Sequence, residues 1–145
     1  MLPESIELVV VTPGKQQLRQ SAKEVQLPGA DGYLGVLPGH APLITELGIG
    51  ELSYHDISGA ESVHLAIIRG FAEVLGDRVT VLAETAEFAA EVDLARAEAA
   101  LARAQKRLAS GDTNVDWDRA IVSLQRALIR IQVARKYRGV HDSSH

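Results

Sequence analysis

Residues 71–84 read FAEVLGDRVTVLAE, and this stretch decides the class of the fold. Apolar and β-branched residues dominate 71–75 and 79–82, and Gly76 and Asp77 stand between the two runs. A Gly-Asp pair between such runs is typical of a two-residue β-hairpin turn. The stretch therefore predicts two antiparallel strands joined by a tight turn.

The β pattern continues upstream, over residues 5 to about 84. Ile6, Leu8 and Val10 alternate with their neighbours, which is the period-two signal of a strand. Residues 63–68 form a β-branched run that Gly70 is expected to close. Such runs recur about every ten residues with Gly, Pro and Asp between them, which favours an antiparallel sandwich or barrel over βαβ units.

The pattern becomes helical downstream of Glu84. Residues 88–109 contain no Gly or Pro and are rich in Ala, Glu, Arg and Leu, which are strong helix formers. Asp93 is expected in the first turn, where a negative charge suits the helix dipole. An apolar stripe with spacings of 3, 4, 3 and 4 predicts one buried helix face, made by Leu94, Ala97, Leu101, Ala104 and Leu108.

A turn at residues 110–114, SGDTN, separates this helix from a second one, expected from about Val115 to Lys136. The second stripe is Trp117, Ile121, Leu124, Leu128 and Ile131, with Ala120, Ala127 and Ala134 beside it. Two striped helices joined by a short loop predict an antiparallel hairpin. Alanine at the seam buries little apolar area, so the hairpin is expected to be weakly held and detachable. The alternative is a permanently docked hairpin.

The expected fold class is α+β, an N-terminal antiparallel β-sandwich followed by a C-terminal antiparallel two-helix hairpin. We expect the sandwich over residues 1–86, the hairpin over 87–138 and a frayed tail over 139–145.

Charge is unevenly distributed along the chain. The net charge is -4, which gives no overall basic excess for nucleic acid. Ten of the 15 Lys and Arg residues lie from Arg96 onward, so the C-terminal third is the part that suits an anionic partner. There is no cysteine, the N-terminus lacks the pattern of a signal peptide, and no apolar stretch is long enough to span a bilayer.

Motifs for catalysis are weak. The Gly- and Pro-rich residues 28–43 lack the Gly-Lys-Ser/Thr ending of a phosphate-binding loop, and are expected to form turns. No Gly-x-Ser-x-Gly elbow occurs. No compact metal motif is found among the histidines, and Gly139 argues against a helix that would bring the last two together; they are His40, His55, His64, His141 and His145. We expect no metal site and no catalytic residue.

Several segments resemble the epsilon family of bacterial F-type ATP synthases. Residues 32–43, GYLGVLPGHAPL, resemble the signature loop of that family. Residues 68–74, IRGFAEV, and 79–84, VTVLAE, are similar to its later strands. Residues 92–97, VDLARA, and the pair Arg119-Ala120 are similar to its helices. The resemblance covers roughly residues 4 to 136.

The resemblance implies a non-catalytic rotor subunit of a proton- or sodium-translocating ATP synthase. Its sandwich is expected to bind the gamma subunit of the central stalk and the polar loops of the c-ring. Its hairpin, when extended, is expected to meet the alpha and beta subunits of the catalytic head and inhibit ATP hydrolysis. The complex would place the chain on the cytoplasmic face of the bacterial plasma membrane. Tyr33, Gly39, His40 and Pro42 are the expected partner contacts, with plain turn chemistry as the alternative.

In some epsilon subunits an Ile/Leu-Asp-x-x-Arg-Ala motif and further arginines bind one ATP. This chain has Val92 at the first position, which departs from the motif and puts the affinity in question. The implied nucleotide site is Glu87, Val92, Asp93, Arg96, Ala97, Arg103, Arg126 and Arg130. Clustered guanidinium groups repel unless an anion such as a triphosphate neutralises them. ATP that bound only the folded hairpin would stabilise it and so act as a sensor.

The alternatives are that these arginines are simply solvated or contact acidic catalytic subunits, and that Glu87 is only an acid at a helix start. No cofactor is expected to be required, and ATP is the expected regulatory ligand, with the part of Mg2+ undecided. Two other functions stay open at this point, a free-standing ATP-binding sensor and a small enzyme with a pocket in the sandwich.

Overall fold

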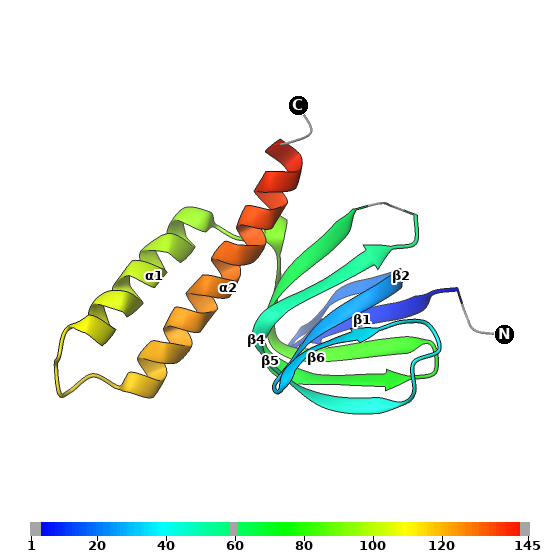
Figure 1. Cartoon of the computed structure of the whole chain (residues 1–145), viewed down its shortest axis with the longest axis horizontal. Coiled ribbons are helices and arrows are strands. Elements are labelled where there is room, and N and C mark those ends of the chain that lie inside the picture. The colour runs from blue at the N-terminus through cyan, green and yellow to red at the C-terminus, as the bar shows by residue number, and fades with distance from the viewer. Residues whose placement is uncertain (1–3, 59–60, 143–145) are drawn as a thin grey trace. The chain divides into compact units, whose positions relative to one another are not determined.

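The structure, a computed structural model, describes residues 4–58 and 61–142. The chain divides into two compact units with the boundary between Phe88 and Ala89. Within the described residues the first unit contains the strands and the second contains the helices (Figure 1).

Six strands make up the first unit as far as it is described. They are β1 (Ile6–Thr12), β2 (Lys15–Gly29), β3 (Gly32–Val36), β4 (Leu43–Asp56), β5 (Ser62–Leu75) and β6 (Arg78–Phe88). Their order in the sheet is β1-β6-β5-β4-β2-β3, and β1 also pairs with β2, so the sheet folds back on itself as a sandwich. The predicted fold class is confirmed. The expectation of purely antiparallel pairing was wrong at one place, because β1 and β6 are parallel neighbours.

The core of this unit contains mostly aliphatic side chains. Fully buried residues include Leu8, Leu27, Leu52, Leu65 and Ile67. Burying each such side chain contributes about 1.5–3 kcal/mol relative to leaving it in water. The hairpin predicted from residues 71–84 is present, with Leu75 paired to Arg78 and a positive φ of 59° at Gly76.

β5 does not end at Gly70, contrary to the prediction. The strand continues through Arg69, with φ 51°, and Gly70, with φ 155°. Before this point the odd-numbered Leu65 and Ile67 belong to the core of the unit, and after it the even-numbered Ala72 and Val74 do. The two unusual residues therefore turn the strand over so that it contributes to both layers (Figure 1). A left-handed conformation costs a residue with a side chain about 1–2 kcal/mol.

The segment 28–43 is less loop-like than the sequence indicated. Gly32–Val36 forms β3, which pairs with β2 at Leu27–Leu34 and Val25–Val36. Val36 is fully buried. Because β3 is an edge strand that brings apolar side chains to the core, pairing and burial outweigh the low strand propensity of its glycines.

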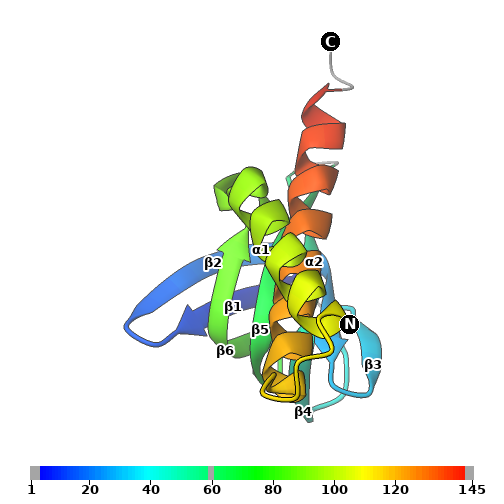
Figure 2. The ribbon, with the colours of Figure 1, turned by 90° about the vertical axis from the view of Figure 1, so that its left-hand side faces the viewer.

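The second unit contains a short 3-10 turn η1 (Ala89–Glu91) and two helices, α1 (Leu94–Ala109) and α2 (Trp117–Asp142). Asp93 is the N-cap of α1 rather than a first-turn residue, and its side chain accepts a hydrogen bond from the Arg96 N–H at 3.1 Å. Asp116 accepts the equivalent bond from the Arg119 N–H at 3.1 Å. Figure 2 shows α1 and α2 side by side.

Alanine forms the seam between the two helices. The buried seam residues are Ala97 and Ala104 of α1 with Ala120, Ala127 and Ala134 of α2. The predicted stripe of α2 was wrong in part, since Trp117, Ile121 and Leu128 are 50%, 41% and 47% exposed. Small side chains allow the closest approach of two helices, so contact forms along the alanines and the longer apolar residues are displaced to its flank.

α2 continues to Asp142, beyond the end expected near Lys136. Gly139 lies inside the helix and does not end it, and the rest of the predicted tail, residues 143–145, lies outside the described residues. In the described part of the chain, neither helix has a segment long and apolar enough to cross a membrane.

Candidate partner-binding surfaces

A row of apolar side chains crosses the outer face of the first unit. Phe71 of β5 pairs with Leu82 of β6, and Leu82 pairs with Val11 of β1. Phe71 and Leu82 are 56% and 54% exposed. Large apolar side chains that remain together on a surface are characteristic of interaction sites.

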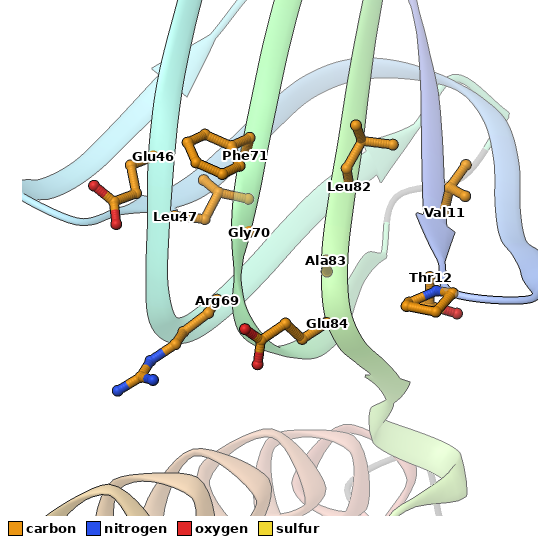
Figure 3. A pocket seen from close by; sticks show the side chains of 11 residues that line it. Val11, Thr12, Glu46, Leu47, Arg69, Gly70, Phe71, Leu82, Ala83 and Glu84 are labelled. Carbon is orange, nitrogen blue, oxygen red and sulfur yellow. The ribbon is translucent and has the colours of Figure 1, made fainter.

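The row borders a shallow groove of about 470 Å3, which we call the outer groove (Figure 3). Besides the apolar row, its lining includes Leu47, Gly70 and Ala83, with the charged residues Arg69, Glu46 and Glu84. Sequence reasoning missed this surface. Its signal is apolar residues on both faces of one strand, since Phe71 is exposed whereas its neighbour Ala72 is buried, a pattern typical of sheets covered on both sides.

The signature loop forms a second surface. In residues 37–42 the His40 N–H donates to the Leu37 carbonyl oxygen at 3.1 Å, and Gly39 has a φ of 87°. The His40 ring Nδ1 lies 2.6 Å from the Ala41 carbonyl oxygen, to which it can donate as N–H. The loop thus holds His40 by local bonds, and Pro42 is exposed beside it.

Tyr33, the fourth predicted contact, belongs to the part of the signature segment that forms β3, and not to residues 37–42. Its side chain is 62% exposed, and its hydroxyl oxygen accepts a hydrogen bond from the Glu51 N–H at 3.0 Å. A Cβ atom at Gly50 would lie 3.0 Å from that hydroxyl oxygen, so glycine at 50 makes room for the ring. Tyr33 is therefore fixed at one end while most of its surface is available to a partner.

Two histidines of the first unit pair with neighbouring side chains. Ser62 Oγ lies 3.0 Å from His55 Nε2, but within the described residues no carboxylate is bonded to His55 to orient it. Glu51 and His64 form a second pair across β4 and β5. No group of three or more potential metal ligands occurs among residues 4–58 and 61–142.

Two residues at the end of β4, Tyr54 and Asp56, have shifted pKa values. Hydrogen bonds donated by the backbone and the hydroxyl of Ser58 lower the pKa of Asp56. Burial raises the pKa of the Tyr54 hydroxyl, and the Asp56 charge adds to the effect. Asp56 therefore holds the turn that follows β4, whereas Tyr54 belongs to the core.

The predicted nucleotide set is divided between the two units. Glu87 lies in β6, paired with Ala66, and does not begin a helix as predicted. The other members belong to the second unit, where Val92 and Ala97 are buried and Asp93 caps α1. These three residues therefore have structural functions whether or not a nucleotide binds.

The four arginines of the set share one face of the hairpin. Arg96 and Arg103 each precede a seam alanine of α1, and Arg126 precedes the seam alanine Ala127 of α2. Arg130 follows Arg126 by about one turn, which returns it to the same side. A two-fold axis approximately relates two antiparallel helices. Residues at the same sequence offset from a seam residue therefore lie on the same side of the hairpin in both helices.

Two further arginines, which were not part of the predicted nucleotide set, belong to this side by the same offsets. They are Arg107 and Arg119, which line a hollow of about 410 Å3 together with Asn114 and Asp116. We call the six residues the basic face: Arg96, Arg103, Arg107, Arg119, Arg126 and Arg130. Arg135 lies on the opposite side of the seam, 3.4 Å from the Glu98 carboxylate.

Family comparisons agree with the division into two units. Residues 5–89 match the model of the ATP synthase delta/epsilon chain β-sandwich domain. Residues 90–135 match the model of the ATP synthase delta/epsilon chain long α-helix domain.

Curated relatives match along most of the chain. An ATP synthase epsilon chain of Solibacter usitatus is 46% identical over 135 residues, covering 93% of this chain and 99% of the relative. The ATP synthase epsilon chain of Geobacter sulfurreducens is 47% identical over 136 residues, covering 93% and 97%.

Among solved structures, a chain of the Euglena gracilis mitochondrial ATP synthase has the same fold, with a TM-score of 0.76 and 24% identity, covering 86% of this chain and 78% of that one. The resemblance found in the sequence is confirmed, and so is the prediction of a subunit that is not catalytic. A sandwich and a helical hairpin, both matched by family models and by full-length relatives, place this chain in the ATP synthase delta/epsilon chain family.

Proposed function

We propose that the chain is a rotor subunit of its ATP synthase, which joins a gamma-type central-stalk subunit to the c-ring and restrains ATP hydrolysis through its hairpin. The observation that carries the proposal is the apolar row of Val11, Phe71 and Leu82 in the lining of the outer groove, where Phe71 and Leu82 are more than half exposed. The proposal also places the chain at the cytoplasmic face of the bacterial plasma membrane, held there by the complex.

The outer groove suits a permanent protein partner. Most of its lining is apolar and three of the residues are charged, a mixture that protein interfaces also have. A related fold occurs in a solved structure of the Tetrahymena thermophila ATP synthase central stalk and c-ring, with a TM-score of 0.60 and 14% identity. The presence of that fold in a central stalk supports the choice of a central-stalk subunit as the partner.

Replacing Phe71 by serine is expected to weaken binding to the purified gamma-type subunit about 30-fold, or roughly 2 kcal/mol, as for an aromatic anchor at an interface. The dissociation constant can be measured by surface plasmon resonance. Because Phe71 is 56% exposed, its replacement should leave the melting temperature nearly unchanged.

The matched control is Ile57→Ser, at an apolar residue that is 45% exposed in the turn after β4 and outside the groove. This variant should bind like the wild type. Equal binding by the wild type and Phe71→Ser would show that the outer groove is not the docking surface for the gamma-type subunit. Failure of the wild type to bind would reject the rotor assignment in favour of a free-standing protein.

We assign the c-ring contact to Gly39, His40 and Pro42 of the second surface, together with Tyr33 of β3. The local bonds of His40 and the anchored hydroxyl of Tyr33 hold these groups in place before a partner arrives. Preorganisation of this kind lowers the entropy lost on binding. The loops of the ring are expected to be polar, which suits a surface with a histidine and a tyrosine.

The basic face is the proposed site of regulation. Six arginines on one side of two packed helices repel one another unless an anion lies among them. A triphosphate supplies that charge and can accept paired hydrogen bonds from each guanidinium group. ATP bound there would favour the closed hairpin, and its loss would free the arginines for acidic surfaces of the catalytic head.

Isothermal titration with ATP is expected to show saturable binding of one nucleotide. Arg126→Ala should weaken that binding at least about tenfold, because a charged hydrogen-bond donor is worth about 1.5–3 kcal/mol. The titration is repeated with ADP, and with and without MgCl2.

Arg135→Ala is the control, since it removes the same charge from the opposite side of the seam, where Arg135 is paired with Glu98. It should bind ATP like the wild type. Absence of heat at millimolar ATP, or equal losses in both variants, would remove nucleotide sensing from the proposal and leave the rotor function in place.

A further inference from the structure

Arg69 has the backbone conformation of a glycine or an asparagine. Its φ of 51° lies in the left-handed region, and no other residue with a side chain has a positive φ in the described part of the chain. The place where β5 turns over, which we call its corner, requires this conformation at position 69, but it does not require arginine. A strained residue type that persists at a surface position points to a use for its side chain.

The guanidinium group has no partner within the described residues. Glu84 lies opposite Arg69, because Ile68 pairs with Thr85 and Gly70 with Ala83. Nevertheless no ion pair joins these two side chains in the described part of the protein. Figure 3 shows both at the same end of the outer groove, where the Arg69 side chain extends outward from β5.

We propose that Arg69 is the specificity contact of the outer groove and binds a carboxylate of the partner that covers Phe71 and Leu82. The inference rests on the proposed function, since it concerns the same docking surface. A charge at the rim of an apolar contact directs the approach and the register of a partner more than it adds to the affinity.

The surrounding charges favour a single register. Glu46 and Glu84 also line the groove, and both repel an acidic side chain. The partner's carboxylate is therefore excluded from most of the rim and attracted only at Arg69. This combination of one attractive and two repulsive charges is an effective way to reject a shifted or incorrect partner.

Arg69→Asn tests the contact, because asparagine accepts the left-handed backbone and lacks the charge. The variant should melt at a higher temperature than the wild type, since strain is removed. It should bind the gamma-type subunit about tenfold more weakly at 50 mM NaCl, with the difference reduced to within about twofold at 500 mM, where charges are screened.

Two matched variants separate a contact with the partner from a purely structural use of Arg69. Arg69→Lys keeps both the charge and the strain, and should bind nearly as the wild type. Glu84→Gln removes the opposite carboxylate, and should bind as well as or better than the wild type. If Arg69 served only to hold Glu84, Glu84→Gln would instead lose as much affinity as Arg69→Asn, and the inference would be rejected.

The remaining outcomes distinguish a failure of the Arg69 contact from a failure of the proposed rotor function. Wild-type binding by Arg69→Asn at low salt, together with weak binding by Phe71→Ser, overturns the role of Arg69 and leaves the docking surface intact. A loss in Arg69→Asn that is equal at both salt concentrations also overturns it, because no ion pair would be involved. A wild-type chain that does not bind the subunit overturns both.

Discussion

Gly70→Ala is expected to lower the free energy of unfolding of the first unit by about 3 kcal/mol or more, among the largest effects of single substitutions. A Cβ atom at this position would collide with the Leu82 carbonyl oxygen and lie 2.8 Å from the Ala83 Cα atom. These neighbours are backbone atoms of β6, so they can move only if the β5–β6 pairing is disturbed. The φ of 155° adds strain for any side chain.

Urea unfolding monitored by circular dichroism measures the effect. Gly76→Ala is the control, since Gly76 also has a positive φ, of 59°, but a Cβ atom there would meet nothing within 4 Å. That variant should lose only about 1 kcal/mol, the cost of the backbone conformation alone. Equal losses of unfolding free energy in the two variants would show that the close approach of Gly70 to the backbone of β6 does not contribute to stability. That result would contradict the explanation given for glycine at position 70.

Ala104→Asp is expected to destabilise the α1–α2 contact by about 3 kcal/mol. Ala104 is 2% exposed at the seam, so an aspartate there would bury a charge for which the seam alanines offer no partner. Its side chain is too short to reach water along the helix. The hairpin should open while the strands of the first unit, which form their own core, keep their structure.

Hydrogen exchange followed by mass spectrometry reports each unit separately. Amide exchange in α1 and α2 should accelerate by about 100-fold, the factor that corresponds to about 3 kcal/mol. Ala102→Asp introduces the same residue on an exposed position of α1 and controls for helix propensity. If both variants exchange alike, the alanine seam does not hold the hairpin together.

The seam also bears on regulation. Alanine gives close packing with little buried area, so a hairpin of this kind is held by a small free energy that a ligand can outweigh. ATP on the basic face would increase the stability of the closed hairpin, whereas a substitution at the seam would decrease it. The proposed sensor therefore needs the same weak contact that Ala104→Asp removes.

Much of the fold could be predicted because it depends on local patterns. The hairpin at Gly76 follows from turn chemistry, and the two helices follow from the absence of Gly and Pro over residues 88–109 and from helical periodicity. The family resemblance followed from contiguous motifs such as residues 32–43. These signals lie within a few residues of one another, so the sequence alone contains them.

Contacts between distant residues were decided only by the tertiary structure. Gly70 does not end its strand, because the close approach of Leu82 and Ala83 makes glycine a requirement of packing rather than a signal to stop. Likewise, the α2 stripe could not be divided into buried alanines and exposed Trp117, Ile121 and Leu128 until α1 was placed against it.

The candidate surfaces divide in the same way. The sequence by itself determined the family, the fold class and the contiguous signature loop with His40. The outer groove needed the structure, because Val11, Phe71 and Leu82 belong to three strands and become neighbours only through the register of the sheet. Periodicity reports which side of a strand a residue occupies, but burial depends on what packs against that side, and that is settled by the whole chain.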